Sequence, residues 1–330
     1  MNGSEAKHQL MELQAKLCAY RHASGLLYYD GVTVAPKGAA DSRGQTLSVL
    51  SEASYRLITD QSTGELLDFL EEHQEELDEK SRRMVFLLRK QLRQMRAIPM
   101  EEYIADQQLV NQAQDVWHTA KEQDNFSMFA PYLERIVENR IRFAGYMEPN
   151  QDPYDVWLNE YEGGLTRASC DAFFSALRER IIPLLQRVCA APQPDDSFLH
   201  GHFPREKQLA LSEYLMHCMG LNREHCGLGE TEHPFTINFS RYDVRITTHF
   251  YEDHLAYAMY STIHEGGHAL YELHTAKEDQ YTELAGGVSM GVHESQSRFY
   301  ENLLGRSKPF LSLIQPKLIQ LFPSCLLYTS

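Results

Sequence analysis

The sequence predicts a mainly α-helical protein that carries one small β-sheet. Through most of the 330-residue chain, apolar residues recur at three- and four-residue intervals, which is the spacing of one face of a helix. Only residues 235–239 and 243–250 are rich in β-branched and aromatic residues with turn formers between them, as in a pair of strands. Hydrophobic residues make up 43% and charged residues 23% of the chain, which is typical of a folded globular protein.

Before residue 220 every regular element is predicted to be a helix. The first covers residues 5–26, and a loop that contains Pro36 follows it. Asp41 is placed to cap a second helix that runs towards Thr59. One or two amphipathic helices fit residues 64–96. The other helices are predicted at residues 100–122, 126–145, 166–190 and 204–219, with a surface loop at residues 191–201 that holds two prolines and two aspartates.

After residue 221 the pattern changes. Residues 225–232 contain glycine and show no periodicity, and the two predicted strands follow them. Helical periodicity returns at residues 252–273, and the pair Gly286-Gly287 then interrupts it. The last helices are predicted at residues 289–304, with Gly305 placed to end the helix, and at residues 310–321.

Charge and composition exclude several classes of function. The net charge is −15 and is spread along the chain, so bulk electrostatics disfavour nucleic acid and anionic membrane surfaces as partners. No run of apolar residues approaches the length of a membrane span, and residues 1–5 do not begin a signal peptide. The six cysteines include no C-x-x-C pair, which favours free thiols. We therefore expect a cytoplasmic protein.

Residues 264–268 form the most informative motif of the sequence. They read His-Glu-Gly-Gly-His, the H-E-x-x-H pattern. Residues four apart share a helix face, so His264 and His268 can bind one metal ion while Glu265 reaches a water beside it. Each glycine costs a helix about 1 kcal/mol relative to alanine, and close approach of a backbone or substrate explains why both are present. The alternative is a pair of histidines packed in the core beside a surface glutamate.

A catalytic zinc site needs a third protein ligand and an open position. Glu272 lies one turn beyond His268, where it suits a partner that orients a metal ligand. Glu294 lies 26 residues after His268, within a polar patch of an otherwise apolar helix, and this favours it as the third ligand. The full set of downstream candidates is Glu272, His274, Glu278, Glu283, His293, Glu294 and Glu301.

Four motifs together resemble the carboxypeptidase Taq family of zinc carboxypeptidases. They are His233-Pro234-Phe235 (H-P-F), residues 243–247 (D-x-R-x-T), residues 264–268 (H-E-x-x-H) and residues 293–296 (H-E-S-Q). Residues 126–180 are also similar to the family, and the resemblance covers most of residues 5–322. It is weaker at residues 28–30, where the family pattern has a tryptophan before the aspartate.

The resemblance implies a two-lobed helical fold with a deep groove and a small sheet beside the zinc helices. It implies that His264, His268 and Glu294 bind zinc and that Glu265 is the general base. It further implies a homodimer that releases single C-terminal amino acids from peptides with broad specificity. Cobalt or manganese also fit two histidines and a carboxylate.

Family members are usually longer, and their C-terminal motif G-x-x-Q-D-x-H-W is absent here. We therefore predict a helical region at 1–220 that forms one wall of the groove, an incomplete catalytic region at 221–323, and a non-native tail at 324–330. A shortened groove leaves two further hypotheses open: an inactive fragment that binds zinc without catalysis, and a related zinc oligopeptidase, against which the D-x-R-x-T and H-E-S-Q motifs argue.

Substrate-binding candidates come from the same motifs. An arginine recognises a terminal carboxylate well, and Arg245 and Arg298 are the candidates, although each can instead form an ion pair with a neighbouring carboxylate. A strand at residues 243–248 can align an extended peptide by main-chain pairing. His233 and His293 either donate to the reacting carbonyl, hold a metal ligand in place, or simply pack.

Overall fold

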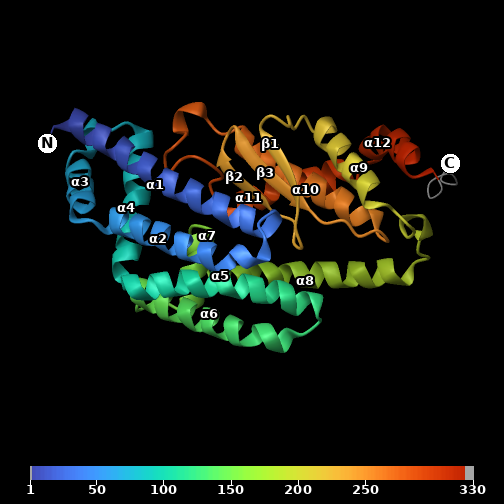
Figure 1. Ribbon diagram of the computed structural model, residues 1–330, viewed down its shortest axis with the longest axis horizontal. Helices are drawn as coiled ribbons and strands as arrows, with labels where there is room; N and C mark the ends of the chain where they lie inside the picture. The colour runs from blue at the N-terminus through green and yellow to red at the C-terminus, as the bar shows by residue number, and fades with distance from the viewer. Residues whose placement is uncertain (1, 324–330) are drawn as a thin grey trace. The chain divides into compact units, whose positions relative to one another are not determined.

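The computed structural model describes residues 2–323. It is mainly helical and has one three-stranded sheet (Figure 1), so the predicted fold class is confirmed. Contacts between Cα atoms group the chain into two units. Unit 1 takes in the chain up to Val156 together with Thr275–Gly286, and unit 2 takes in Trp157–His274 and the chain from Gly287 onward. The predicted functional division at residue 220 stays a prediction, and the predicted tail at 324–330 lies outside the described residues.

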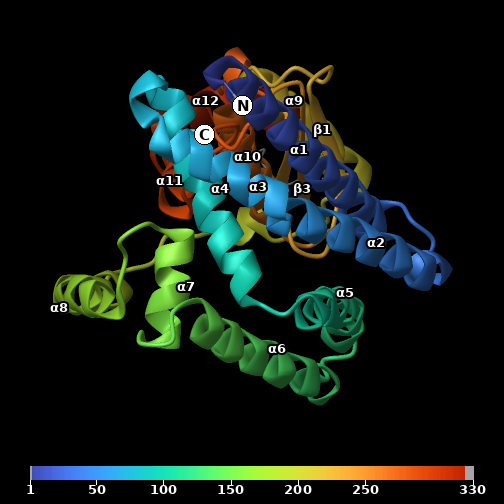
Figure 2. The same ribbon diagram turned by 90° about the vertical axis from the view of Figure 1, so that its left-hand side faces the viewer.

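Unit 1 is built from helices. Leucines from α1, α3 and α4, among them Leu10, Leu67 and Leu88, form its buried core. Helices α5 and α6 lie side by side (Figure 2). The elements are α1 (Gly3–Thr33), the 3₁₀ turn η1 (Lys37–Ala39), α2 (Ala40–Thr59), α3 (Gln61–Glu72), η2 (Gln74–Glu76), α4 (Glu79–Ala97), α5 (Met100–Glu122), α6 (Phe126–Met147) and η4 (Lys277–Asp279). Helix α7 (Pro153–Tyr161), which periodicity did not predict, crosses the division between the units.

The predicted N-cap of α2 is wrong. Helix α2 begins at Ala40, so Asp41 lies inside its first turn and Ala39 stands at the cap without a side-chain hydrogen bond. The cause is the 3₁₀ turn Lys37–Ala39, which leads into the helix and makes the backbone helical before Asp41 is reached.

The sheet of unit 2 has the strand order β1-β3-β2. Strands β2 (Thr236–Ser240) and β3 (Asp243–Thr248) are the predicted pair of strands and are antiparallel, and β1 (Cys226–Glu230) adds parallel to β3. Glycine at two of the five positions of β1 hides its strand character, because glycine is depleted in strands. Gly227 has a packing reason, since a Cβ there would meet the Arg245 side chain at 2.9 Å.

Helix α10 (Leu255–Leu273) is the central element of unit 2 and contacts β2, β3, α9 (Arg205–Cys218) and α11 (Met290–Arg298). Leu215, Leu255 and Ile263 are buried between these helices and α12 (Lys308–Leu321), while Val244, Ile246 and Ala269 pack α10 against the sheet. The predicted helix at 252–273 is therefore present, and the sheet, α9 and α11 pack around the part of it that carries the H-E-x-x-H motif.

The predicted helix at 289–304 is present but changes its winding. Helix α11 continues as a π-helix, η5 (Phe299–Gly305), which ends at Gly305 as predicted, although Arg306 is the C-cap and Gly305 does not have a positive φ. A π-helical turn rotates the residues that follow relative to an α-helix, and such turns are frequent at functional sites.

Helix α8 (Arg167–Ala190) has no buried residue, and η3 (Ser197–Leu199) follows it. Its apolar side chains are among the exposed ones, including Phe173 at 61% and Leu185 at 56%.

Among residues 2–323, every helix is too short or too polar to span a bilayer. The cysteines of this part of the chain are free thiols, and burial raises the pKa of Cys226 to about 12.

Candidate metal centre

Helix α10 places His264 and His268 on one face, with their ring centroids 5.0 Å apart. Glu294 on α11 faces both rings: its Oε2 lies 3.6 Å from Nε2 of His264 and 3.4 Å from Nε2 of His268. One donor atom from each of the three side chains lies within 4.8 Å of the other two. The predicted set of three ligands is thus brought together.

Two of the separations between these atoms match those expected around a zinc ion. Zinc binds histidine nitrogen and carboxylate oxygen at about 2.0–2.2 Å in tetrahedral sites, which places two of its donor atoms about 3.4 Å apart. The two histidine–Glu294 distances of 3.6 and 3.4 Å are close to that separation. Two histidines and one carboxylate also leave a fourth position open, as a catalytic site requires.

Hydrogen bonds at the far side of each ring leave the Nε2 atoms for a metal. Nδ1 of His264 lies 2.9 Å from Oε2 of Glu301, and Nδ1 of His268 lies 2.6 Å from Nδ1 of His293. Burial, followed by the charges of His293 and His264, lowers the pKa of His268 to about 4. His268 is therefore neutral near pH 7, the state in which imidazole binds a metal.

The helices α10 and α11 approach each other at the second glycine of the motif. A Cβ on Gly267 would lie 2.9 Å from the carbonyl oxygen of Gln296 and 2.9 Å from Cα of Ser297. A Cβ on Gly266 would instead meet Met219, at 2.7 Å from its terminal Cε. The two glycines predicted that a backbone or a substrate approaches this helix closely. At Gly267 the approaching element is the backbone of α11, the helix that carries Glu294.

Glu265 is buried, with 6% of its surface exposed. Its Oε2 accepts a hydrogen bond of 2.7 Å from the hydroxyl of Thr236 on β2. Burial raises the pKa of Glu265, and the Thr236 hydrogen bond and the charge of His264 offset part of that rise. A carboxylate with a raised pKa is a stronger base, which suits proton transfer.

A pocket of about 780 Å³ opens beside these side chains. Of the residues predicted from the sequence, His233, His264, Glu265, Glu294 and Arg298 line it. The other lining residues are Leu199, Pro234, His254, Ala256, Tyr257, Tyr260, Ser261, Glu301 and Arg306. The metal cluster, the buried carboxylate and a cavity of a size that suits a small ligand are therefore found together in unit 2.

Arg245 is placed elsewhere. Its guanidinium makes two hydrogen bonds to Asp243, of 2.9 and 2.8 Å, and lies over the ring of Phe239. It does not line the pocket. This is the ion pair that the sequence left open as the alternative. Because Arg245 also does not line the pocket, the geometry does not favour it as a carboxylate-binding group.

Arg298 also forms the ion pair that the sequence left open as its alternative, since it donates to Glu294 at 2.7 Å and to Glu301 at 3.2 Å. Burial alone would raise the pKa of Glu294, but the hydrogen bond from Arg298 and the charge of His264 hold it below its usual range. Glu294 is therefore ionised at neutral pH, as a metal ligand must be.

Sequence reasoning missed Arg306 and did not separate Glu301 from the other carboxylates downstream of the motif. Glu301 is 8% exposed, and Arg306 donates to it at 2.9 Å while stacking on the ring of Tyr260 at 3.9 Å. The seven-residue spacing from Glu294 to Glu301 was the available signal, because residues seven apart lie on one helix face.

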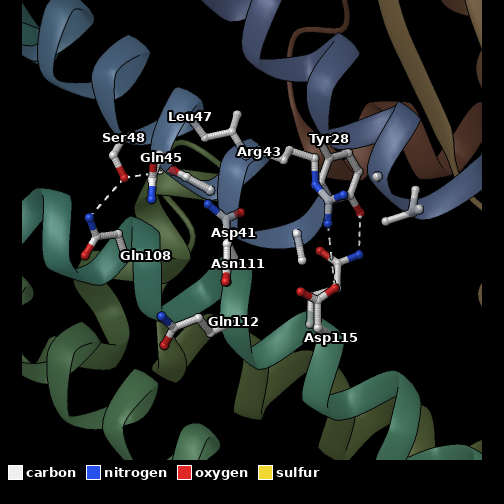
Figure 3. Close-up of a pocket in the computed structure, with 15 residues that line it drawn as sticks. Tyr28, Asp41, Arg43, Gln45, Leu47, Ser48, Gln108, Asn111, Gln112 and Asp115 are labelled. Carbon is white, nitrogen blue, oxygen red and sulfur yellow. Dashed lines mark hydrogen bonds and ion pairs between the residues drawn. The ribbon is translucent and has the colours of Figure 1, made fainter. Parts of the chain in front are cut away.

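A second pocket, of about 290 Å³, lies in unit 1 and is lined mainly by polar side chains of α1, α2 and α5 (Figure 3). Gln108 donates to Ser48 at 3.0 Å, and Gln114 donates to the hydroxyl of Tyr28 at 3.3 Å. None of the residues predicted to bind metal or substrate lines this pocket.

Comparison with known proteins places the chain in a family. A family model described as carboxypeptidase Taq (M32) metallopeptidase matches residues 9–329, which include most of the predicted tail. Carboxypeptidase 1 of Bacillus subtilis (strain 168) is 37% identical over 316 residues, which are 96% of this chain and 63% of that protein. Thermostable carboxypeptidase 1 of Pyrococcus furiosus is 34% identical over 99% of this chain and 66% of its own length.

Solved structures agree with these relatives. The M32 carboxypeptidase from Deinococcus radiodurans R1 has a TM-score of 0.89 and 34% identity, and the match covers 99% of this chain and 65% of that one. The chain therefore spans about two thirds of the length of these relatives. On the family match and these identities, the chain belongs to the carboxypeptidase Taq (M32) family of metallopeptidases.

Proposed function

We propose that this protein is a zinc-dependent carboxypeptidase that releases single C-terminal amino acids from peptides, with broad specificity. The observation that carries the proposal is the cluster of His264, His268 and Glu294 donor atoms within 4.8 Å of one another, beside a pocket that Glu265 lines. Relatives that are named carboxypeptidases share a third of the sequence or more, which supports the same chemistry here.

In this proposal each residue of the site has its own role. His264, His268 and Glu294 hold the metal, which when bound lowers the pKa of water and polarises a carbonyl oxygen. Glu265 accepts a proton from the attacking water while the oxygen of that water bonds to the last peptide carbonyl carbon. Glu265 then delivers this proton to the leaving amine as the C–N bond breaks. Thr236 orients the Glu265 carboxylate through its hydrogen bond to Oε2.

The pocket supplies groups for the substrate. Arg298 and Arg306 line it and are both about half exposed, so each can add a hydrogen bond to a peptide carboxylate. His233 lines the same pocket, and its proposed role is to donate a hydrogen bond to the reacting carbonyl. Cobalt or manganese in the site, a homodimer and a cytoplasmic location stay predictions.

The test is the release of the C-terminal amino acid from an N-blocked peptide, with and without added zinc. We expect zinc-dependent release of one amino acid, and no release from the same peptide with an amidated C-terminus. Internal cleavage of both peptides would instead indicate the oligopeptidase alternative. Absence of any zinc-dependent cleavage would contradict the proposed activity.

A second candidate is a chain that binds zinc without turnover. The exposed apolar face of α8 favours it, because Phe173, Phe174 and Leu185 are each more than half exposed and exposed apolar patches mark either an interaction surface or a tendency to aggregate. In that case zinc would bind with unchanged stoichiometry, and neither peptide would be cleaved.

A further inference from the structure

We infer that His293 is a positioning residue, which fixes the ring of His268 through a chain of hydrogen bonds that is anchored on Glu272. The inference rests on the proposed metal site, because it concerns how one of its ligands is held. The chain runs from Nδ1 of His268 to Nδ1 of His293 over 2.6 Å, and from Nε2 of His293 to Oε1 of Glu272 over 2.6 Å.

Only one arrangement of protons satisfies every contact when His268 binds metal. Its Nε2 faces Glu294 and must offer a lone pair, so its proton is on Nδ1. That proton is donated to Nδ1 of His293, which must then be unprotonated. The proton of His293 is consequently on Nε2, where it is donated to the Glu272 carboxylate. Glu272 therefore selects the His293 tautomer, and His293 selects that of His268.

Glu272 is itself held on both oxygens. It is 4% exposed, and Oε2 accepts from the side-chain amide of Asn238 at 2.7 Å while Oε1 accepts from the backbone N–H of Gly287 at 3.0 Å. Because each oxygen of this buried carboxylate accepts a hydrogen bond, the carboxylate is held in one orientation. It thus provides a fixed end for the chain.

The glycines of the loop before α11 leave space for the His293 ring. A Cβ on Gly287 would lie 2.4 Å from Cδ2 of His293 and 3.0 Å from the ring of Tyr271. Gly286 precedes it with φ +94°, a conformation that favours glycine. The glycine pair that interrupts the helical pattern therefore lets the backbone donate to Glu272 while the imidazole packs against it.

The two metal-binding histidines are supported differently. His264 contacts a carboxylate directly, since Glu301 lies 2.9 Å from its Nδ1 and is held by Arg298 and Arg306. His268 contacts a second imidazole, and its carboxylate is one step further away. Removing the acceptor at position 293 should consequently affect His268 and leave the support of His264 in place.

The test compares His293→Leu with His293→Asn. Leucine removes the acceptor, whereas asparagine keeps an oxygen close to the position of Nδ1. We expect His293→Leu to weaken zinc binding about 10–100-fold, the usual loss when a partner of a metal ligand is removed, and His293→Asn to restore most of it. The readout is zinc affinity by competition with a chromophoric chelator, with His274→Leu as a control, because the exposed ring of His274 bonds to the backbone carbonyl of Leu270.

A second measurement needs no variant. Histidine ¹⁵N spectra of the zinc-loaded wild-type chain report which ring nitrogen carries the proton. We expect Nδ1 for His268 and Nε2 for His293. Equal zinc affinity in wild type and His293→Leu, or a proton on Nδ1 of His293, would overturn the inference. Zinc binding that is insensitive to His264→Ala as well would instead refute the metal site, which distinguishes the two failures.

Discussion

Replacing Glu265 with glutamine is expected to lower kcat about 10²–10⁴-fold, the usual contribution of a general base, while zinc affinity stays nearly unchanged. Glutamine has the same shape, and its amide oxygen can still accept the Thr236 hydrogen bond. It cannot accept a proton from water at neutral pH. The measurement is kcat for an N-blocked peptide, together with the zinc dissociation constant of both proteins.

The control is Glu213→Gln, which changes a half-exposed carboxylate paired with Arg223 in the same unit. That variant should keep the wild-type rate. Wild-type turnover by Glu265→Gln would refute its assignment as the base. A parallel loss of zinc affinity in Glu265→Gln would mean that the side chain acts on the metal site and not on the proton.

Replacing Gly267 with alanine is expected to destabilise the metal-free chain by about 1–3 kcal/mol, the usual cost of overpacking, and to weaken zinc binding at least about 10-fold. The added Cβ would press on the backbone at Gln296 and Ser297, 2.9 Å away. Backbone in a packed helix cannot move aside cheaply, so α11 must shift, and Glu294 shifts with it. Denaturant unfolding and chelator competition measure the two effects.

Gly266→Ala is the matched control, one residue away on the same helix. Its Cβ would meet the flexible end of Met219, which can change rotamer, and alanine also gains about 1 kcal/mol of helix propensity over glycine. We expect little change in stability or zinc affinity. Equal effects of the two substitutions would contradict the account of why the motif carries two glycines.

The sequence predicted most of the helices because their amphipathic periodicity is local and strong. Helix α5 has the predicted bounds, 100–122, and α6 and α8 differ from them by at most two residues. Strand β1 was not predicted because its two glycines lower its β-propensity. It forms a strand through its pairing with β3, which the local sequence does not reveal. The predicted cap at Asp41 is wrong because the preceding 3₁₀ turn makes the backbone helical before Asp41 is reached.

The residues of the candidate site were also predictable only where the signal is local in the sequence. His264, Glu265 and His268 follow from the spacing of one helix, and Glu294 from a polar patch on the helix that returns. Arg245 was predicted to bind the substrate carboxylate because of its residue type. In the structure its guanidinium pairs with Asp243 instead. The contacts of Glu301 and His293 depend on the π-helical turn and on the Gly286-Gly287 loop, which periodicity does not reveal.

The central claim is that His264, His268 and Glu294 form one zinc site, and zinc titration of the purified chain tests it most directly. We expect one zinc per chain in the wild type and in Glu213→Gln. In His264→Ala, His268→Ala and Glu294→Ala, we expect the affinity to fall so far that the zinc is lost to the competing chelator. Wild-type affinity in all three alanine variants, or the absence of stoichiometric zinc in the wild type, would contradict the account.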